Sequence, residues 1–455
     1  MPTGIHGAPL RRESRMMRGW LTGLLALSLL VPLGAAAADD VAEQLRAMQE
    51  RMSQLEDRLE ATSDELSSAN QRLSAQQSLI EQVELDQKAS SGLAPFLDTL
   101  EIGGWLSASY FYNFNDPDGR ALAGSNTGGF AYPFHPDANS FSLDQFWLWL
   151  ERPVSEENRA GFRVDLAYGK DAGLLSGDFG AGDGFSGNDF ELYQAYIQYL
   201  APVGEGVTFQ FGKFATLIGA EVVQAPDNFN ITRGHVYNLF QPITHTGILA
   251  STGVAGLDVS LGFVNETRSF PANDIDRNKN KAFLWSIGGG GDQFSWSING
   301  VHGDSDSGQG FDTPAGDKET IVDVILSYSP TEQFTTYINA DYIESENSRG
   351  NDVQGYGIAW AGRLAINERL GAALRAEYVD LDDFFGGNSD LEIWGITTTV
   401  DYKLTEALTV RGEIRYDDIA DGGGLFVDDE SFGVGLADFD QDTQLTAGVE
   451  VIYTF

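Results

Sequence analysis

The sequence predicts a transmembrane β-barrel of about 16 antiparallel strands, preceded by an N-terminal α-helical coiled coil. Three observations predict this fold class. The last fifteen residues, QDTQLTAGVEVIYTF (441–455), alternate apolar and polar side chains with a period of two, which only a β-strand separates into two faces. Residues 41–88 carry a seven-residue apolar repeat instead. Between these two stretches, short turns and long loops alternate along a series of further period-two segments.

Composition excludes several classes of function. The 455 residues include no cysteine, which rules out thiol catalysis, disulfides and Cys-ligated metal sites. The formal net charge of -39 argues against a nucleic-acid partner, which would need a basic patch. No apolar run of about 20 residues follows the N-terminal region, so we expect no transmembrane helix in the mature protein.

Residues 1–38 have the pattern of a secretory signal peptide. An apolar run, 20–33, precedes small residues that offer A-x-A cleavage before Asp39. The basic residues that precede this run are Arg11, Arg12, Arg15 and Arg18. An uncleaved anchor is the alternative, but the apolar run is short and ends in proline and small residues. Cleavage would remove four arginines and one glutamate, which changes the formal charge from -39 to about -42.

Residues 39–90 predict a periplasmic coiled coil, followed by a linker at 91–98. Apolar side chains recur every seven residues for about six heptads, and a helix with so narrow a stripe needs partners to bury it. The predicted oligomerisation seam consists of Leu45, Met48, Met52, Leu55, Leu59, Leu66, Leu73 and Ile80. The later d positions of the heptads are less apolar, namely Thr62, Ala69 and Gln76. The seam therefore does not determine the number of helices in the oligomer. A helix packed on a globular domain of the same chain is the alternative.

Residues 99–455 predict the barrel. The sixteen expected strands are 100–112, 139–152, 159–170, 188–200, 206–214, 244–252, 256–265, 279–289, 293–302, 319–329, 333–343, 352–366, 368–380, 391–403, 406–417 and 441–455. Their connections are alternately very short and long, and the long ones are rich in Gly, Asp, Asn and Ser. This alternation is typical of a transmembrane barrel, and a soluble β-sandwich has no reason to show it. An even strand number places both termini at the short-turn rim, which is the periplasmic side.

The two faces of the predicted strands support a water-filled interior. Along 406–417, Leu408, Val410 and Ile414 would face lipid, while Arg411 and Glu413 would face inward. Charges at mid-height require water, because an unpaired buried charge is too costly. Eight strands would be filled by their own side chains, whereas sixteen leave an aqueous channel.

Three stretches resemble the OmpL-like family of β-barrel porins. They are IGGWLSASYFYNFNDPDG (102–119), FSLDQFWLWLERP (141–153), and ELYQAYIQYLAPVGEGVTFQFGKFATLIGAE with NFNITRGHVYNLFQPITHTGILAS (191–221 and 228–251). The resemblance implies a channel in the bacterial outer membrane, in contact with outer-membrane lipid and lipopolysaccharide. The final Tyr-x-Phe is similar to the closing strand of outer-membrane barrels. That likeness implies that Tyr453 and Phe455 close the barrel and mark it for assembly.

The loop 215–243 differs from the other long loops because it is rich in apolar residues. Leu217, Ile218, Val222 and Phe229 would be wasted in solvent, so we expect the loop to fold inward, as the third loop of general porins does. An ordered external cap is the alternative. An inward loop would bring Glu221, Asp227 and Arg233 near the pore.

Four arginines at inward positions of late strands predict the opposite side of a constriction. They are Arg363, Arg375, Arg411 and Arg415. We expect the narrowest point between these guanidinium groups and the acidic side chains of loop 215–243. The alternative is that each arginine pairs with a nearby inward acid, such as Glu377 or Glu413, and braces the wall.

No catalytic signature occurs in the sequence, and we expect neither an enzyme nor a cofactor nor a metal site. His235 and His245 lie in and just after one loop, without a carboxylate at ligand spacing, which disfavours a zinc pair. The acidic side chains of the long loops favour a solvated rim over specific calcium sites. These are Asp304, Asp306, Asp312, Asp317, Asp380, Asp382, Asp383, Asp428, Asp429 and Glu430.

The sequence therefore favours an outer-membrane porin for small hydrophilic solutes or ions, with a cation preference and a homotrimeric assembly. The first alternative is a structural tether whose coiled coil links the outer membrane to the cell wall. The second alternative is an outer-membrane hydrolase, since fold does not decide function.

Overall fold

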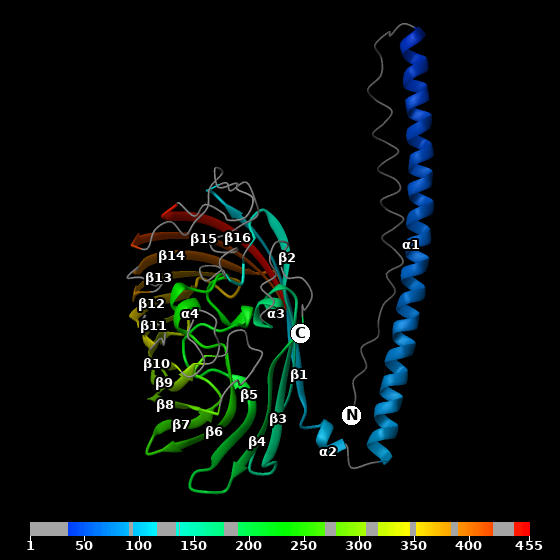
Figure 1. Cartoon of the computed structure of the whole chain (residues 1–455). Coiled ribbons are helices and arrows are strands. Elements are labelled where there is room, and N and C mark those ends of the chain that lie inside the picture. The colour runs from blue at the N-terminus through cyan, green and yellow to red at the C-terminus, as the bar shows by residue number, and fades with distance from the viewer. Residues whose placement is uncertain are drawn as a thin grey trace. The chain divides into compact units, whose positions relative to one another are not determined.

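The computed structural model describes residues 35–90, 94–115, 133–135, 137–176, 190–268, 279–305, 317–345, 352–383, 390–421 and 441–455. The chain divides into two compact units, Met1–Pro95 and Phe96–Phe455, and each is described by itself. The second unit is a closed antiparallel barrel in which each strand pairs with its neighbours in sequence, and β1 pairs with β16 (Figure 1). The predicted fold class of the barrel is therefore confirmed.

The strands follow the predicted ones closely. They are β1 (Glu101–Asn113), β2 (Ser140–Arg152), β3 (Ala160–Tyr168), β4 (Phe190–Ala201), β5 (Val207–Ala215), β6 (Thr244–Val254), β7 (Leu257–Val264), β8 (Ala282–Gly290), β9 (Phe294–Ser305), β10 (Asp317–Thr331), β11 (Phe334–Ser345), β12 (Val353–Ala365), β13 (Leu370–Asp382), β14 (Leu391–Lys403), β15 (Leu408–Asp421) and β16 (Thr443–Thr454).

The last residue takes part in closing the barrel. The Phe455 amide donates to the Gly104 carbonyl at 2.9 Å, and the Gly104 amide donates back to the Phe455 carbonyl at 3.0 Å. The ladder continues from Trp105, which is paired with Thr454. Because these bonds join the first strand to the last, they leave no open edge between β1 and β16.

The two faces of each strand divide as the period-two pattern predicts. Along β13, Leu374 is exposed on the outer face, while Arg375 and Glu377 are buried on the inner face. Along β15, Ile414 is exposed, and Glu413 and Arg415 are buried. An apolar outer face and a polar inner face are what a strand needs when lipid lies on one side and a polar interior on the other.

The short turns lie at one rim. Val254 pairs with Leu257, so only Ala255 and Gly256 connect β6 to β7. Both have a positive φ, of 53° and 81° respectively. Positive φ at both central residues matches the right-handed twist of the two strands and permits this two-residue hairpin.

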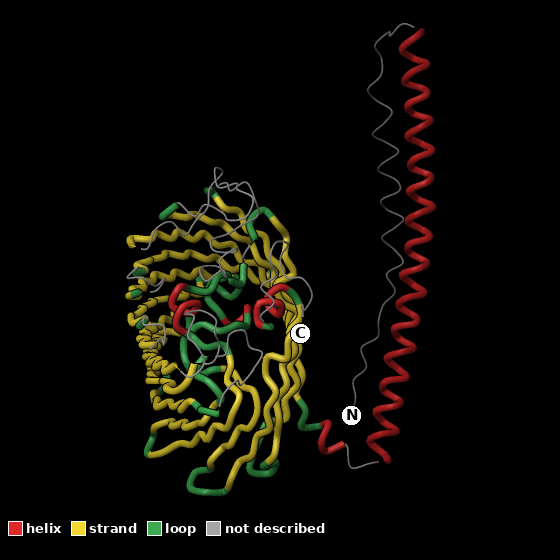
Figure 2. The backbone as a smooth tube through the Cα atoms, in the orientation of Figure 1, coloured by secondary structure: helices red, strands yellow, loops and turns green. Residues whose placement is uncertain are grey.

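Segments between strands occupy the inside of the ring. The helices α3 (Lys170–Leu175) and α4 (His235–Phe240), with the 3-10 turn η2 (Ala225–Asp227), lie within the circle of strands (Figures 1 and 2). Phe240 and Ile231 are fully buried in an apolar cluster that includes inward side chains of many strands. The loop 215–243 therefore folds inward, as its apolar composition predicts, and does not form an external cap.

The chain enters the barrel through a short helix, α2 (Ala94–Leu97). Phe96 stacks on Phe162 with ring centroids 6.3 Å apart, and the Arg152 guanidinium lies 5.3 Å from the centre of the Phe96 ring. Arg152 also donates to the Thr99 hydroxyl at 3.0 Å. These contacts fix the start of the barrel unit to the beginning of β3 and the end of β2.

Over residues 35–90, the first unit is one helix, α1 (Ala35–Ser90). It begins inside the predicted signal segment 1–38, whose residues 1–34 lie outside the described part of the chain. The seam side chains for which exposure is described are all solvent-exposed, up to 76% for Leu59. None of the described helices has the length and apolar content that a membrane-spanning helix needs. The coiled coil itself stays a prediction.

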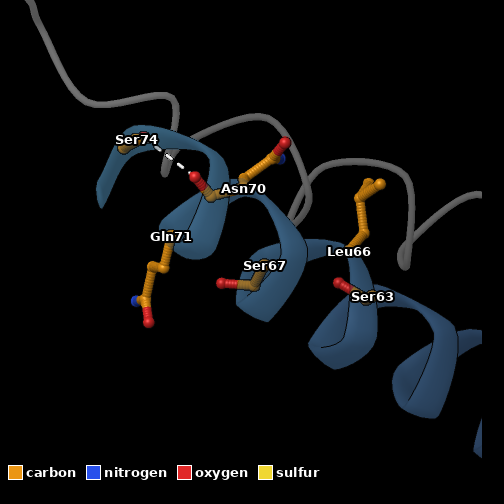
Figure 3. Close-up of a pocket in the computed structure, with 6 residues that line it drawn as sticks. All are labelled: Ser63, Leu66, Ser67, Asn70, Gln71 and Ser74. Atoms are coloured by element: carbon orange, nitrogen blue, oxygen red, sulfur yellow. Dashed lines mark hydrogen bonds between the residues drawn. The ribbon is translucent and has the colours of Figure 1, made fainter. Parts of the chain in front are cut away.

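An open pocket lies on the surface of α1 (Figure 3). Within it, the Ser74 hydroxyl donates to the Asn70 carbonyl at 2.8 Å. The six residues that line the pocket are Ser63, Leu66, Ser67, Asn70, Gln71 and Ser74. No titratable side chain is among them, so the pocket offers no acid–base chemistry.

Candidate functional site

The candidate site is the interior of the barrel, and residues 216–243, here called the inner loop, dominate it. The inner loop leaves the end of β5 and returns at the start of β6, where Ala215 pairs with Thr244. Between these neighbouring ends it reaches β11, then β13 to β15, and also β2. The loop thus extends from β5 to strands eight positions away in a ring of sixteen, which places it across the lumen.

Arg375 of β13 holds the middle of the inner loop. Its guanidinium lies 2.6 Å from Glu221 Oε1, donates to the Thr232 carbonyl at 2.6 Å and donates to the Thr397 hydroxyl at 3.0 Å. Glu377, two residues along the same strand, lies 3.3 Å from Arg375 Nε. The guanidinium is fully buried, so its charge depends on these two carboxylates rather than on water.

Glu413 of β15 accepts hydrogen bonds from the backbone of the inner loop. The Ile231 amide donates to Oε2 at 2.6 Å, and the Thr232 amide and hydroxyl donate to Oε1 at 3.1 and 2.6 Å. Thr399 of β14 donates a further bond at 2.8 Å. The carboxylate satisfies two loop amides that would otherwise be buried without partners, which is expensive.

Arg411 and Arg415, also on β15, hold the loop on either side of Glu413. Arg411 donates to the carbonyls of Asn228 and Ala225 at 2.8 and 3.0 Å and pairs with Glu450 of β16. Both arginines are buried. Together with Arg375 they bind loop carbonyl groups along the same wall, and each charge has a carboxylate partner.

Arg415 connects this wall to the start of α4. It donates to the Arg233 carbonyl at 2.8 Å and lies 2.9 Å from both Asp417 Oδ1 and the His235 ring nitrogen Nε2. Asp417 Oδ1 also lies 2.7 Å from His235 Nε2. These contacts fix the first residue of α4 to β15 by side chains that are all buried.

Asn339 of β11 ties both ends of the inner loop to the wall. Its side-chain oxygen accepts from the Ala220 amide at 2.8 Å and from Gln241 Nε2 at 3.1 Å. Its amide nitrogen donates to Asp323 at 2.6 Å and to Asp341 at 2.9 Å. One neutral side chain therefore couples the outgoing and returning parts of the loop to two inward carboxylates.

Gln145 of β2 binds the loop from a different part of the ring. Its Nε2 donates to the Val223 carbonyl at 2.7 Å and to Asp171 of α3 at 2.6 Å, and its Oε1 accepts from the Ala225 amide at 3.1 Å. Burial raises the pKa of Asp171 to about 7, although the Arg233 guanidinium lowers it. The loop is thus bonded to the wall on both sides of the β1–β16 closure.

The structure separates the predicted site residues into two groups. Glu221, Arg233, Arg375, Arg411 and Arg415 are buried in contacts between the inner loop and the wall or within the loop. The Arg233 guanidinium lies 4.8 Å above the Phe134 ring.

Arg363 and Asp227 form the second group. Arg363 does not reach the inner loop in the described contacts; it pairs with Asp401 of β14 at 2.7 Å, and 30% of its side chain is exposed. Asp227 is exposed on η2. Partial burial of its carboxyl group still raises the pKa of Asp227, and the Arg163 guanidinium on β3 lowers that pKa.

Sequence reasoning did not single out Gln145 and Asn339. Both are inward-facing residues of strands that period-two alternation had already located. Neither carries a charge, so the search for arginines and acids passed over them. An inward amide next to a predicted inward loop is the signal that could have found them, because buried backbone groups need such partners.

The described residues show no group of three His, Asp or Glu side chains that could hold a metal ion. His235 contacts Asp417, whereas His245 contacts the Thr216 hydroxyl at 3.1 Å. Of the acidic loop residues, Asp304 binds Lys318 and Asn280. Asp306, Asp312, Asp428, Asp429 and Glu430 lie outside the described part of the chain.

Comparisons with known proteins agree with the barrel fold. A porin from Comamonas acidovorans, described as anion-selective, has a TM-score of 0.53 and 11% identity; the match covers 78% of this chain and 99% of that one. OmpT, an outer membrane protein of Vibrio cholerae in its trimer form, has a TM-score of 0.52 and 12% identity, with coverage of 78% and 99%. At such identities the likeness shows the fold alone. No curated protein matches the chain in sequence.

A family model gives a more specific assignment of the chain than the solved structures do. The model described as "Putative beta-barrel porin-2, OmpL-like" matches residues 99–455, which include every strand that the structure describes. The chain therefore belongs to this OmpL-like family of outer-membrane β-barrel porins.

Proposed function

We propose that the protein is a passive channel of the bacterial outer membrane for small hydrophilic solutes or ions, and not an enzyme. The observation that carries this proposal is the inner loop, which is bonded to the wall across a ring of sixteen strands. A ring of this size without such a loop leaves a wide aqueous channel. A loop that ion pairs hold across this ring narrows the channel without a conformational change.

The narrowest point in this proposal lies beside the inner loop. Arg375, Arg411 and Arg415 hold the loop against β13–β15. In this proposal the arginines brace the loop, and the loop forms one side of the constriction. The two roles that the sequence offered for these arginines are therefore combined. Arg363 and Asp227 are exposed to solvent and can interact with solutes directly. Planar-bilayer reconstitution tests the channel function, because a structural tether would give no unit conductance.

We expect the channel to prefer cations at low salt. Without the predicted signal peptide the chain would have a formal charge of about -42, and such a charge concentrates cations at the mouth of a pore. The preference should weaken towards 1 M salt, where the Debye length falls to about 3 Å. The measurement is the reversal potential in salt gradients of increasing ionic strength. A preference for anions in dilute salt would contradict this prediction.

We further propose that the mature protein starts after a cleaved signal peptide and is a homotrimer joined in the periplasm by α1. The exposed seam of α1 supports this, because its described apolar side chains follow a heptad repeat on the surface of the helix, and such a stripe is buried when helices associate. The trimer form of OmpT is a property of that protein and offers a parallel for the barrel. A tether to the cell wall through α1 is the competing use of the same seam.

The seam can be tested by substitution in the full chain. Leu59→Asp with Leu66→Asp places two charges in the seam and should convert trimers to smaller species, since buried unpaired charges are costly. The control is Ser67→Asp with Ser74→Asp, which adds the same charges at heptad positions outside the seam. Mass measurement in mild detergent reads the outcome. A wild-type protein that is monomeric, or two variant pairs that behave alike, would disprove assembly through this seam.

A further inference from the structure

Two acidic side chains lie opposite each other on neighbouring strands beside the inner loop. Asp323 of β10 and Asp341 of β11 are directly paired in the ladder, and both are buried on the inner face. The side-chain nitrogen Nδ2 of Asn339 donates to both carboxyl groups, at 2.6 and 2.9 Å, so one neutral donor joins them. Like charges directly opposite each other on one face of an antiparallel pair repel, and this pair is at most 3% exposed to the water that would screen the repulsion.

Among the described residues, no lysine or arginine forms an ion pair with Asp323 or Asp341. The hydrogen bonds that other residues donate to the two carboxyl groups all come from neutral groups, namely the side chains of Asn299 and Asn339 and the amide of Gly219. Arg268 acts on Asp341 only at longer range, because its own ion pair is with Glu319 at 3.5 Å. Two buried carboxylates without a paired cation are costly, so this site calls for a positive charge.

The returning end of the inner loop brings a neutral oxygen to the same place. Gln241 donates from Nε2 to Asn339 Oδ1 at 3.1 Å, and its other amide atom, Oε1, has no hydrogen-bond partner in the described part of the chain. The backbone of Gly219 lies against the Gln241 side chain, since a Cβ built on this glycine would fall 1.8 Å from Gln241 Cδ. The Gly219 amide in turn donates to Asp323, which places the Gln241 side chain beside the acidic pair.

One oxygen of Asp341 is in the same state as Gln241 Oε1. Asp341 Oδ1 is buried and accepts no hydrogen bond from the described residues. Carboxylate and amide oxygens are the ligands that Ca²⁺ prefers in proteins, and its double charge balances the two aspartates. Two carboxylates and one amide supply part of the about six to eight oxygens that Ca²⁺ takes, and water completes such a shell. The ligand types and the uncompensated charge therefore both fit a divalent cation.

We propose that Asp323, Asp341 and Gln241 bind one divalent cation, and that Ca²⁺ fits these ligands best. The cation fastens the inner loop to β10 and β11 near both ends of the loop, whereas the arginines of β13–β15 hold its middle. The sequence predicted no metal site, because the three ligands come from two strands and a loop that only the fold brings together. The proposal is independent of the channel function, since binding and stability are measured without conduction.

Denaturant unfolding of the full chain in detergent, after a chelator has removed divalent cations, tests the site. About 10 mM CaCl₂ should lower the equilibrium constant for unfolding about tenfold, as a dissociation constant of about 1 mM requires. Asp341→Asn should abolish this effect. Without Ca²⁺ the same variant should resist denaturant better than the wild type, because it removes one of two opposed charges. Gln241→Met keeps both carboxylates and should weaken Ca²⁺ binding at least about threefold, since it removes one ligand.

Asp380→Asn is the matched control, because it also belongs to an acidic pair across neighbouring strands. Asp380 of β13 is directly paired with Glu392 of β14, but both side chains are partly exposed and lie on the outer face. This variant should keep the full response to Ca²⁺, whereas diffuse binding to an acidic protein would give Asp341→Asn and Asp380→Asn the same response.

Three outcomes would overturn the proposal. The first is a wild-type protein whose unfolding does not respond to Ca²⁺, and the second is a response that survives in Asp341→Asn. The third is a wild-type protein that mild acid stabilises while Ca²⁺ has no effect, which would assign the positive charge to a proton shared by Asp323 and Asp341. Loss of the Ca²⁺ response in Asp341→Asn, with the response retained in Asp380→Asn, would establish the site.

Discussion

Replacing Arg375 with methionine is expected to lower the free energy of unfolding by about 3–5 kcal/mol. The substitution leaves Glu221 and Glu377 buried without the cation that lies 2.6 and 3.3 Å from them. It also removes the donor to the Thr232 carbonyl, so one loop acceptor loses its partner. The measurement is denaturant unfolding of the folded barrel in detergent, compared with the wild type.

Two further variants separate the lost ion pair from the lost side chain. Arg363→Met removes an arginine whose partner Asp401 lies on the neighbouring strand, but this pair is 30% exposed at the arginine and should cost less than about 1 kcal/mol. Arg375→Met combined with Glu221→Gln removes both charges and should recover part of the loss. Equal losses for Arg375→Met and Arg363→Met would show that burial beneath the loop does not set the strength of the contact.

The fold could be predicted from the sequence because a membrane barrel repeats one local rule. Period-two alternation and turn length are both local, and they place β14 at the predicted residues 391–403. The same alternation places Arg375, Arg411 and Arg415 on the inner face. The family follows from stretches such as 141–153 and agrees with the match over residues 99–455.

The contacts of the site could not be predicted in the same way. Strand alternation gives the face of Arg375 but not its partners, Glu221 and Thr232, which are more than a hundred residues away in the sequence. Whether an inward arginine lines a pore or holds a loop depends on the path of that loop.

Removing the inner loop is expected to have the largest effect on conduction. Ala215 and Thr244 are paired neighbours, so a linker of about four glycine and serine residues can replace 217–242 without stretching the barrel. A ring of sixteen strands that has lost this loop should conduct several-fold more current per channel, because its interior is wide enough for an aqueous channel. Single-channel recording of the refolded variant is the measurement, with a two-residue insertion between Ala255 and Gly256 as the control.

The direction of the change in selectivity is a second result of the same experiment. Deletion frees Arg375, Arg411 and Arg415 from loop carbonyl groups and exposes them to water together with Glu377, Glu413 and Asp417. We therefore expect a wider channel with weaker charge selection, since screening by water and salt acts on every exposed pair. Unchanged conductance in a folded deletion variant would place the narrowest point outside the inner loop, and the bonds made by Arg375 and Glu413 would then serve stability alone.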